Sequence, residues 1–145
     1  MPFDILHSGM NIMLAPCEVA VKCGLPAIRA TIAKQLMAKY GLKQAEIAQL
    51  LGVSQPAISL YYRRIRGNAI NLDIDGEIKD SIGELARRLS QRNLSNVDFF
   101  SAFCDICRKM RAKGLLCEAH KTLDPSIDTE NCGLCTSTTS TGCIR

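Results

Sequence analysis

The chain has 145 residues and eight cysteines, and its 18 Lys and Arg exceed its 14 Asp and Glu by four. It contains neither a basic export signal nor a run of about eighteen uncharged apolar residues, so no membrane association is expected and we predict a soluble cytoplasmic protein. In that compartment the cysteines are better suited to metal ligation or redox chemistry than to a disulfide framework.

The positive charge is concentrated in the first half of the chain. Residues 1–68 hold eight Lys and Arg against three Asp and Glu, whereas residues 69–145 hold ten against eleven, so the net charge of +4 divides into +5 and −1. Such asymmetry is expected when one half of a protein meets a polyanion. We expect an all-α chain in three parts: a DNA-binding domain over 1–68, a linker and dimerisation helix over 69–94, and a cysteine-rich metal-binding module over 95–145.

The first predicted helix begins at Gly24 or Leu25. Pro26 lies near its start and Gly41 just beyond its end, positions that suit these residue types. The apolar residues at helical spacing are Ile28, Ile32, Leu36 and Tyr40. This amphipathic pattern predicts that the helix packs behind the elements that follow it.

Residues 42–61 fit two short helices folded about a tight turn. Ala48 is small where the two helices would cross, and Gly52 can adopt the positive φ of the turn. Ser54 stands at an N-cap position, and Pro56 falls in the first turn of the second helix, where its missing N–H is tolerated. This pattern is typical of a DNA-reading motif.

The outward residues of the second helix are predicted to meet DNA. Short or amide-bearing side chains can reach base edges in a major groove, and guanidinium groups at the end of the helix can pair with phosphates. The alternative is an ordinary helical hairpin whose arginines only solvate a surface. The predicted DNA contacts of this helix are Ser54, Gln55, Ala57, Ser59, Tyr62, Arg63, Arg64 and Arg66.

A further helix is predicted from about Asp75 to Gln91. Its apolar stripe is narrow and consists of Ile78, Ile82, Leu85 and Leu89. The stripe suits a seam between two copies of the chain, and a homodimer is attractive because helix-turn-helix proteins usually bind two-fold DNA sites. Alternatively, the stripe covers the core of its own chain.

Ser95 is predicted to cap the next helix, roughly residues 96–112, which Gly114 closes. Val97, Phe100, Phe103 and Cys104 or Cys107 are expected toward one side of it. The last thirty residues are too polar to build a hydrophobic core unaided.

The cysteines of the last third form the strongest chemical signal in the chain. Two C-x-x-C pairs and an intervening cysteine predict a metal site, because each pair lets two thiolates converge on one centre. The predicted ligands are Cys104, Cys107, Cys117, Cys132 and Cys135. Buried cysteines acting as small hydrophobic residues are the alternative.

The identity of the metal is open at this point. Zinc would be satisfied by Cys104, Cys107, Cys132 and Cys135, or by Cys104, Cys107, Cys117 and His120. A 4Fe-4S cluster would take Cys104, Cys107, Cys117 and one cysteine of the later pair. Basic residues near Cys107 favour the anionic cluster over zinc without deciding between them.

The remaining candidate groups carry less information. Cys17 and Cys23 do not have ligand spacing and are interpreted as structural or incidental, with one of them a possible sensing thiol. No Ser/His/Asp set, carboxylate pair or phosphate-cradling glycine loop accompanies the cysteines, so the chain is not expected to be an enzyme. Cys143 and the Thr/Ser tract before it have no interpretation.

Three stretches together resemble a group of archaeal helix-turn-helix regulators: P-C-E at 16–18, L-P-A-I-R at 25–29 and the segment from Gln44 to Ser59. The same block is similar to the DNA-binding domain joined to thiamine-phosphate synthase in some archaea, although no synthase domain follows here. The resemblance covers roughly residues 14–67, and the cysteine-rich tail extends it to about Cys135.

The resemblance implies a phage-repressor-like transcription regulator with an iron–sulfur or zinc module. In that class, glutamines at two helix starts cooperate at the DNA, which implies that Gln44 braces Gln55. The implied activity is sequence-specific binding of double-stranded DNA, tuned by a cluster that senses redox state or iron–sulfur supply. The alternative is a DNA-binding or interaction protein with a purely structural zinc site.

Overall fold

The computed structural model describes residues 13–136. The regular secondary structure of this part of the chain is all helical, without strands. The α-helices are α1 (Pro16–Val19), α2 (Leu25–Tyr40), α3 (Gln44–Leu51), α4 (Gln55–Tyr62), α5 (Gly76–Ser90), α6 (Asn96–Ala112) and α7 (Cys117–Leu123). A π-helical segment, η1 (Ala20–Gly24), joins α1 to α2, and a 3-10 turn, η2 (Leu72–Ile74), precedes α5. Within residues 13–136, no helix has both the length and the apolar character needed to cross a membrane.

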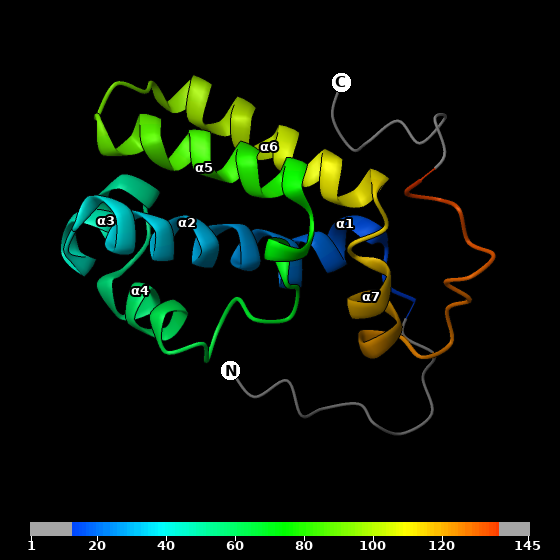
Figure 1. Cartoon of the computed structure of the whole chain (residues 1–145). Helices are drawn as coiled ribbons and strands as arrows, with labels where there is room; N and C mark the ends of the chain where they lie inside the picture. The colour runs from blue at the N-terminus through cyan, green and yellow to red at the C-terminus, as the bar shows by residue number, and fades with distance from the viewer. Residues whose placement is uncertain (1–12, 137–145) are drawn as a thin grey trace.

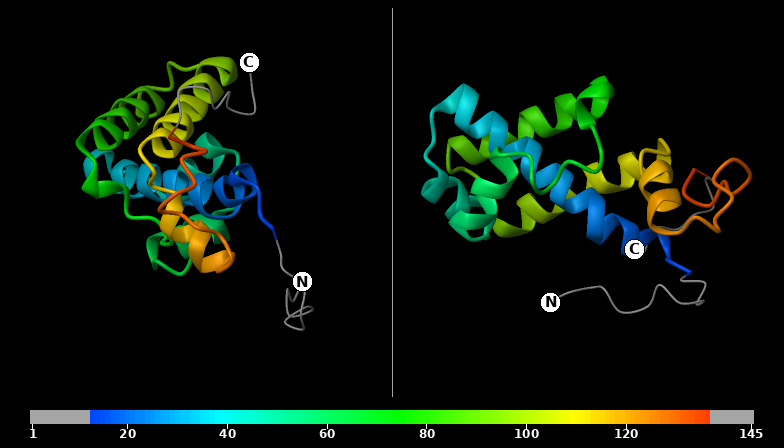
Figure 2. Two further views of the ribbon diagram at one scale, coloured as in Figure 1. Left: turned by 90° about the vertical axis from the view of Figure 1, so that its right-hand side faces the viewer. Right: turned by 90° about the horizontal axis from the view of Figure 1, so that it is seen from below.

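Helix α2 is the axis of the fold (Figure 1). It contacts α5 along one side and α3 and α4 on another, and α6 packs mainly against α5. Ile28, Ile32 and Leu36 of α2 are fully buried, which confirms the predicted apolar face for these residues, whereas Tyr40 at the end of the helix is 38% exposed. Helix α7 and the segment after it lie at the opposite end of α2 from α3 and α4 (Figures 1 and 2). Helices α3 and α7 therefore lie near opposite ends of α2, which is about 24 Å long for its 16 residues.

The start of α2 agrees with the prediction, but the helical path begins earlier. Residues from Pro16 onward are already helical, and the π-helical segment leads directly into Leu25. Pro26 gives a physical reason for the wider turn, because a proline cannot donate a backbone hydrogen bond and crowds the carbonyl group four residues before it. The continuous helical path from Pro16 to Tyr40 therefore includes Cys17, which lies near α6.

The apolar stripe of α5 faces the core of its own chain. Ile78, Ile82, Leu85 and Leu89 are each at most 5% exposed, and they belong to one cluster with the buried residues of α2 and α6. Burial of these side chains within one chain leaves no stripe for a second copy, so the predicted dimer seam at these residues is wrong. Homodimer formation through another surface stays a prediction.

Helix α6 begins where it was predicted to begin, and one residue expected on its apolar side lies elsewhere. The Ser95 hydroxyl group accepts a hydrogen bond from the backbone N–H of Asp98 at 3.1 Å, as expected for an N-cap. Phe100, Phe103, Cys104 and Cys107 border one hollow, as expected for residues on one side, whereas Val97 does not line it and is 78% exposed. The buried residues of α6 are Phe103, Ile106 and Met110. This face is the one that α5 and α2 cover.

Oppositely charged side chains join the start of α5 to the end of α6. Asp75 caps α5, because its Oδ1 accepts from the backbone N–H of Ile78 at 3.0 Å, and its Oδ2 accepts from Lys113 Nζ at 3.0 Å. Lys113 Nζ also lies 2.9 Å from Glu77 Oε2. The Ile78 N–H and then the Lys113 ammonium group lower the pKa of Asp75.

We expect this cap to make stability depend on acid pH. A carboxyl group with a lowered pKa in the folded state contributes stability above its unfolded pKa, and this contribution disappears as the pH falls through the folded pKa. Between about pH 6 and pH 3, the melting temperature of wild type should therefore fall more than that of Asp75→Asn. Thermal unfolding followed by circular dichroism measures this. Asp80→Asn, which removes an exposed carboxylate of α5, is the control; if it flattened the profile as much as Asp75→Asn, the cap would not be responsible.

Candidate nucleic-acid interface and cysteine sites

A turn of three residues, 52–54, joins α3 to α4. Gly52 ends α3 with a φ of 64°, the left-handed conformation that the sequence predicted for it. Ser54 Oγ accepts from the backbone N–H of Ala57 at 3.3 Å, which confirms the predicted N-cap. Ile47 and Ile58 are fully buried, so the two helices share a core. This core fixes which face of α4 points outward.

The outer face of α4 carries most of the predicted contact residues. Ser54 and Gln55 are exposed at its start, Tyr62 is 58% exposed at its end, and Ser59 is half-buried between them. Gln44 is half-buried at the start of α3. The prediction for Ala57 is wrong: it is 8% exposed and lies on the buried face with Ile58 and Tyr61, because positions four apart share one side of a helix.

A run of exposed guanidinium groups follows α4. Arg63, Arg64 and Arg66 are all exposed. Arg64 has a φ of 58°, and its carbonyl oxygen accepts from Asn68 Nδ2 at 2.9 Å, so the backbone turns sharply here. The Arg66 guanidinium lies 5.8 Å from the ring centre of Tyr61. The arginines therefore occupy an ordered turn at the end of α4.

Gly67 presses this turn against α2. Its φ is +73°, and a Cβ at this position would lie 2.6 Å from the carbonyl oxygen of Pro26 and 2.7 Å from Ala30 Cβ. Only glycine permits so close an approach. No local sequence pattern indicates this packing role, because Pro26 and Ala30 lie far from Gly67 in the sequence.

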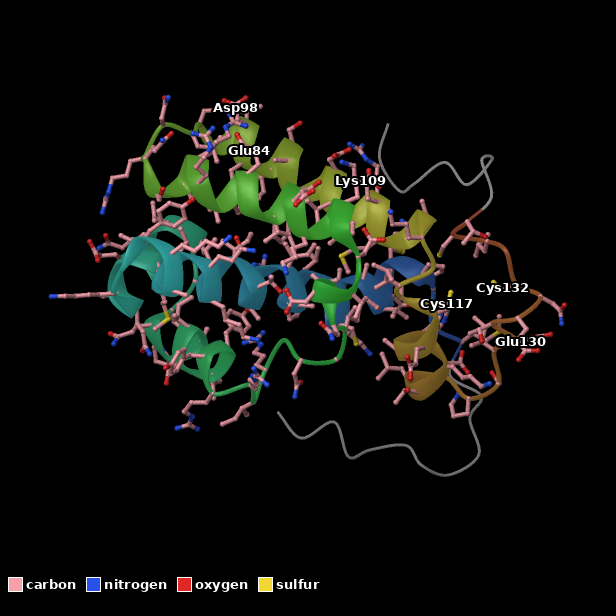
Figure 3. All side chains as sticks on the ribbon, in the orientation of Figure 1. Glu84, Asp98, Lys109, Cys117, Glu130 and Cys132 are labelled. Carbon is pink, nitrogen blue, oxygen red and sulfur yellow. The ribbon has the colours of Figure 1, made fainter. Side chains whose placement is uncertain are left out.

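Three of the predicted metal ligands, Cys117, Cys132 and Cys135, line one hollow of about 270 Å³ at the far end of the molecule. We call it the α7 hollow, and His120, Glu130 and Pro16 also line it. Figure 3 shows Cys117 on α7 beside Cys132 and Glu130 of the following segment. Burial raises the pKa of the Cys117 thiol, and the nearby Cys135 and Cys132 raise it further. Three thiolates so close together would repel one another unless a cation lay between them.

The side chains of His120 and Asp124 form hydrogen bonds to the backbone of Leu14, two residues before α1. His120 Nε2 lies 2.7 Å from the carbonyl oxygen of Leu14, and because a carbonyl oxygen only accepts, Nε2 carries the proton. The backbone N–H of Leu14 donates to Asp124 Oδ2 at 3.3 Å. Both side chains are buried, at 6% and 4% exposure. Helix α7 is thereby tied to the segment that leads into α1 and α2.

The other predicted pair, Cys104 and Cys107, lines a different hollow, of about 290 Å³, between α6 and the segment formed by α1, η1 and the start of α2. We call it the α6 hollow. Cys17 of α1 also lines it, together with Phe100, Phe103 and Arg29. All three cysteines are half-buried. No spacing signal marks Cys17 in the sequence, because its neighbours in space come from a distant part of the chain.

The five predicted ligands are therefore divided between two hollows. Both zinc sets and the 4Fe-4S set named from the sequence combine residues of the α6 hollow with residues of the α7 hollow, so the structure brings none of these sets together. Among residues 13–136, no three His, Cys, Asp or Glu side chains are placed to hold a single metal ion. The donor types of the α7 hollow suit zinc, but their placement does not. Cys143 lies outside the described residues.

Comparison of the chain with family models, with curated proteins and with solved structures found no match.

Proposed function

We propose that the chain is a sequence-specific DNA-binding transcription regulator that reads the major groove with α4. One observation carries the proposal: a capped helix presents Ser54 and Gln55 at its exposed start and three exposed arginines at its end. Amide and hydroxyl groups suit base edges, whereas guanidinium groups suit phosphates. The two kinds of group lie on one short element, as groove insertion requires.

Gln55→Ala tests this reading most directly. We expect the variant to lose about 1 to 3 kcal/mol of binding free energy on a preferred sequence and almost none on random duplex DNA, because a base-edge contact carries specificity. The preferred duplex would be selected from a randomised pool by wild type, and affinities measured by fluorescence anisotropy.

Gln49→Ala is the matched control, since Gln49 is an exposed glutamine of α3 that faces a hollow against α5 and α6. It should bind like wild type. The proposal fails if wild type enriches no sequence, or if Gln55→Ala loses affinity equally on both duplexes.

The proposal includes regulation by an iron–sulfur cluster bound to cysteines. When bound, such a cluster supplies one-electron redox chemistry. The route to DNA would run from the cysteines through α1 and η1 to α2, and from α2 to α4, which packs on it. A route through a dimer seam on α5 is not available, because the apolar residues of α5 are buried within the chain. DNA affinity should differ between cluster-loaded, oxidised and cluster-free protein; equal affinities would exclude sensing.

A structural zinc site with constitutive DNA binding is the second candidate. It is favoured by the donor types of the α7 hollow, where three thiols and one imidazole match a common zinc ligand set. Nε2 of His120 is already engaged by Leu14, however, so only its other ring nitrogen would remain for a metal. Iron, zinc and acid-labile sulfide analysis of anaerobically purified protein separates the two candidates.

A further inference from the structure

We infer that Cys17 is the third thiolate ligand, with Cys104 and Cys107, of an iron–sulfur cluster seated in the α6 hollow. This inference deepens the proposed regulation by naming its site. It departs from the sequence interpretation in two respects. Cys17 becomes a ligand, and Cys117, Cys132 and Cys135 are left to the separate α7 hollow.

The packing of the fold supplies the third thiol. The segment η1, which follows α1, packs against α6, and this contact brings Cys17 to the hollow that Cys104 and Cys107 line. Cys23, six residues further along, is buried at 8% exposure, and burial raises its thiol pKa. Cys23 does not line the hollow. The chain thus offers one accessible thiol and one inaccessible thiol in the same segment.

The shape of the hollow favours a cluster over a single ion. The three thiols line a space of about 290 Å³, and no three donor side chains in residues 13–136 are placed to hold a single metal ion. A cluster fills the space between its ligands, whereas a single ion requires them to meet. Phe100, Phe103 and Leu25 form apolar walls. Apolar surroundings limit solvent access to a metal centre.

Charge distinguishes the two hollows. Arg29, Arg108 and Arg111 line the α6 hollow, and Arg29 lies over Phe103 with its guanidinium carbon 5.3 Å from the ring centre. Glu130 is the charged residue that lines the α7 hollow. A thiolate-bound cluster is anionic, so it is stabilised beside guanidinium groups and opposed beside a carboxylate. Binding releases one proton from each thiol as its sulfur bonds to iron.

Reconstitution with ferrous iron and sulfide under anaerobic reducing conditions tests the assignment. Iron and acid-labile sulfide per chain should fall at least about tenfold in Cys17→Ala, Cys104→Ala and Cys107→Ala, since even the loss of a ligand's outer-shell partner costs that much affinity. Cys23→Ala is the matched control and should keep the wild-type content, as should Cys132→Ala. Far-ultraviolet circular dichroism checks that each variant is folded.

Cys17→Ser keeps the test decisive if Cys17→Ala fails to fold. A serine oxygen can replace the sulfur, and the electron paramagnetic resonance spectrum of the reduced cluster should then change, whereas Cys23→Ser should not change it. Wild-type iron content in Cys17→Ala, an unchanged spectrum in Cys17→Ser, loss of the cluster in Cys132→Ala, or zinc in place of iron would each overturn the inference.

DNA binding is measured on the same samples. Binding of a selected duplex by iron-free protein would leave the proposed DNA-reading function intact while the inference fails. Cluster retention that depends on Cys17, without sequence-specific DNA binding, would contradict the function and not the ligand assignment.

Discussion

Replacing Gly67 with alanine is expected to lower the free energy of unfolding by about 2 to 5 kcal/mol. Two costs add at this position. The left-handed backbone, with φ of +73°, strains any residue with a Cβ, and the new methyl group would lie 2.6 Å from the Pro26 carbonyl oxygen. Neither the backbone of α2 nor Ala30 can move aside cheaply. Urea unfolding followed by circular dichroism measures the loss.

Gly52→Ala separates the two costs. Gly52 has nearly the same φ, +64°, but nothing lies within 4 Å of the position of its Cβ. It should therefore lose only the strain contribution, about 1 to 2 kcal/mol. Equal losses in the two variants would show that the contact between Gly67 and α2 does not constrain the fold.

Removing the three arginines after α4 is expected to weaken DNA binding on every sequence. In the triple variant Arg63→Ala, Arg64→Ala and Arg66→Ala, the slope of log affinity against log salt should become shallower by about 3, because each phosphate contact releases roughly one counterion. At about 0.15 M salt this corresponds to a roughly hundredfold loss of affinity. Fluorescence anisotropy across a salt series on selected and random duplexes measures both quantities.

The control must change the net charge equally. Lys79→Ala, Arg88→Ala and Lys121→Ala remove three positive charges from α5 and α7, away from α4. This variant should keep a slope close to that of wild type. If it lost affinity as strongly as the α4 variant, attraction would depend on overall charge, and the arginine turn would not be a phosphate-binding site.

The arrangement of the two functional regions bears on any regulation. Leu25 and Arg29, at the start of α2, line the α6 hollow, and the arginine turn after α4 packs on Pro26 and Ala30 of the same stretch. A change at the cysteines can therefore reach α4 through α2, because η1 joins α2 to α1 and α2 packs directly on α4.

Local rules in the sequence predicted most of the helices. Gly41 and Gly52 adopt the left-handed conformation at helix ends, and Ser54 and Ser95 cap the helices that follow them. These features depend only on residues within about one helical turn, so propensity and spacing are enough to find them. The all-helical class and the boundaries of α2 followed from the same reasoning.

The sequence by itself determined approximately where α2 to α6 begin and end, that positive charge gathers in the first half, and that thiols gather near the end, but it did not predict α1, η1 or α7. Only the tertiary structure decided which faces are covered. It buried Ala57 and the α5 stripe, exposed Val97, and placed Cys17 beside Cys104. A helical pattern states which residues share a side, but the partner helix that covers that side is set by packing between distant segments. For the same reason, the cysteines of the last third are divided between two hollows, and Cys17, from a distant part of the sequence, lines one of them together with Cys104 and Cys107.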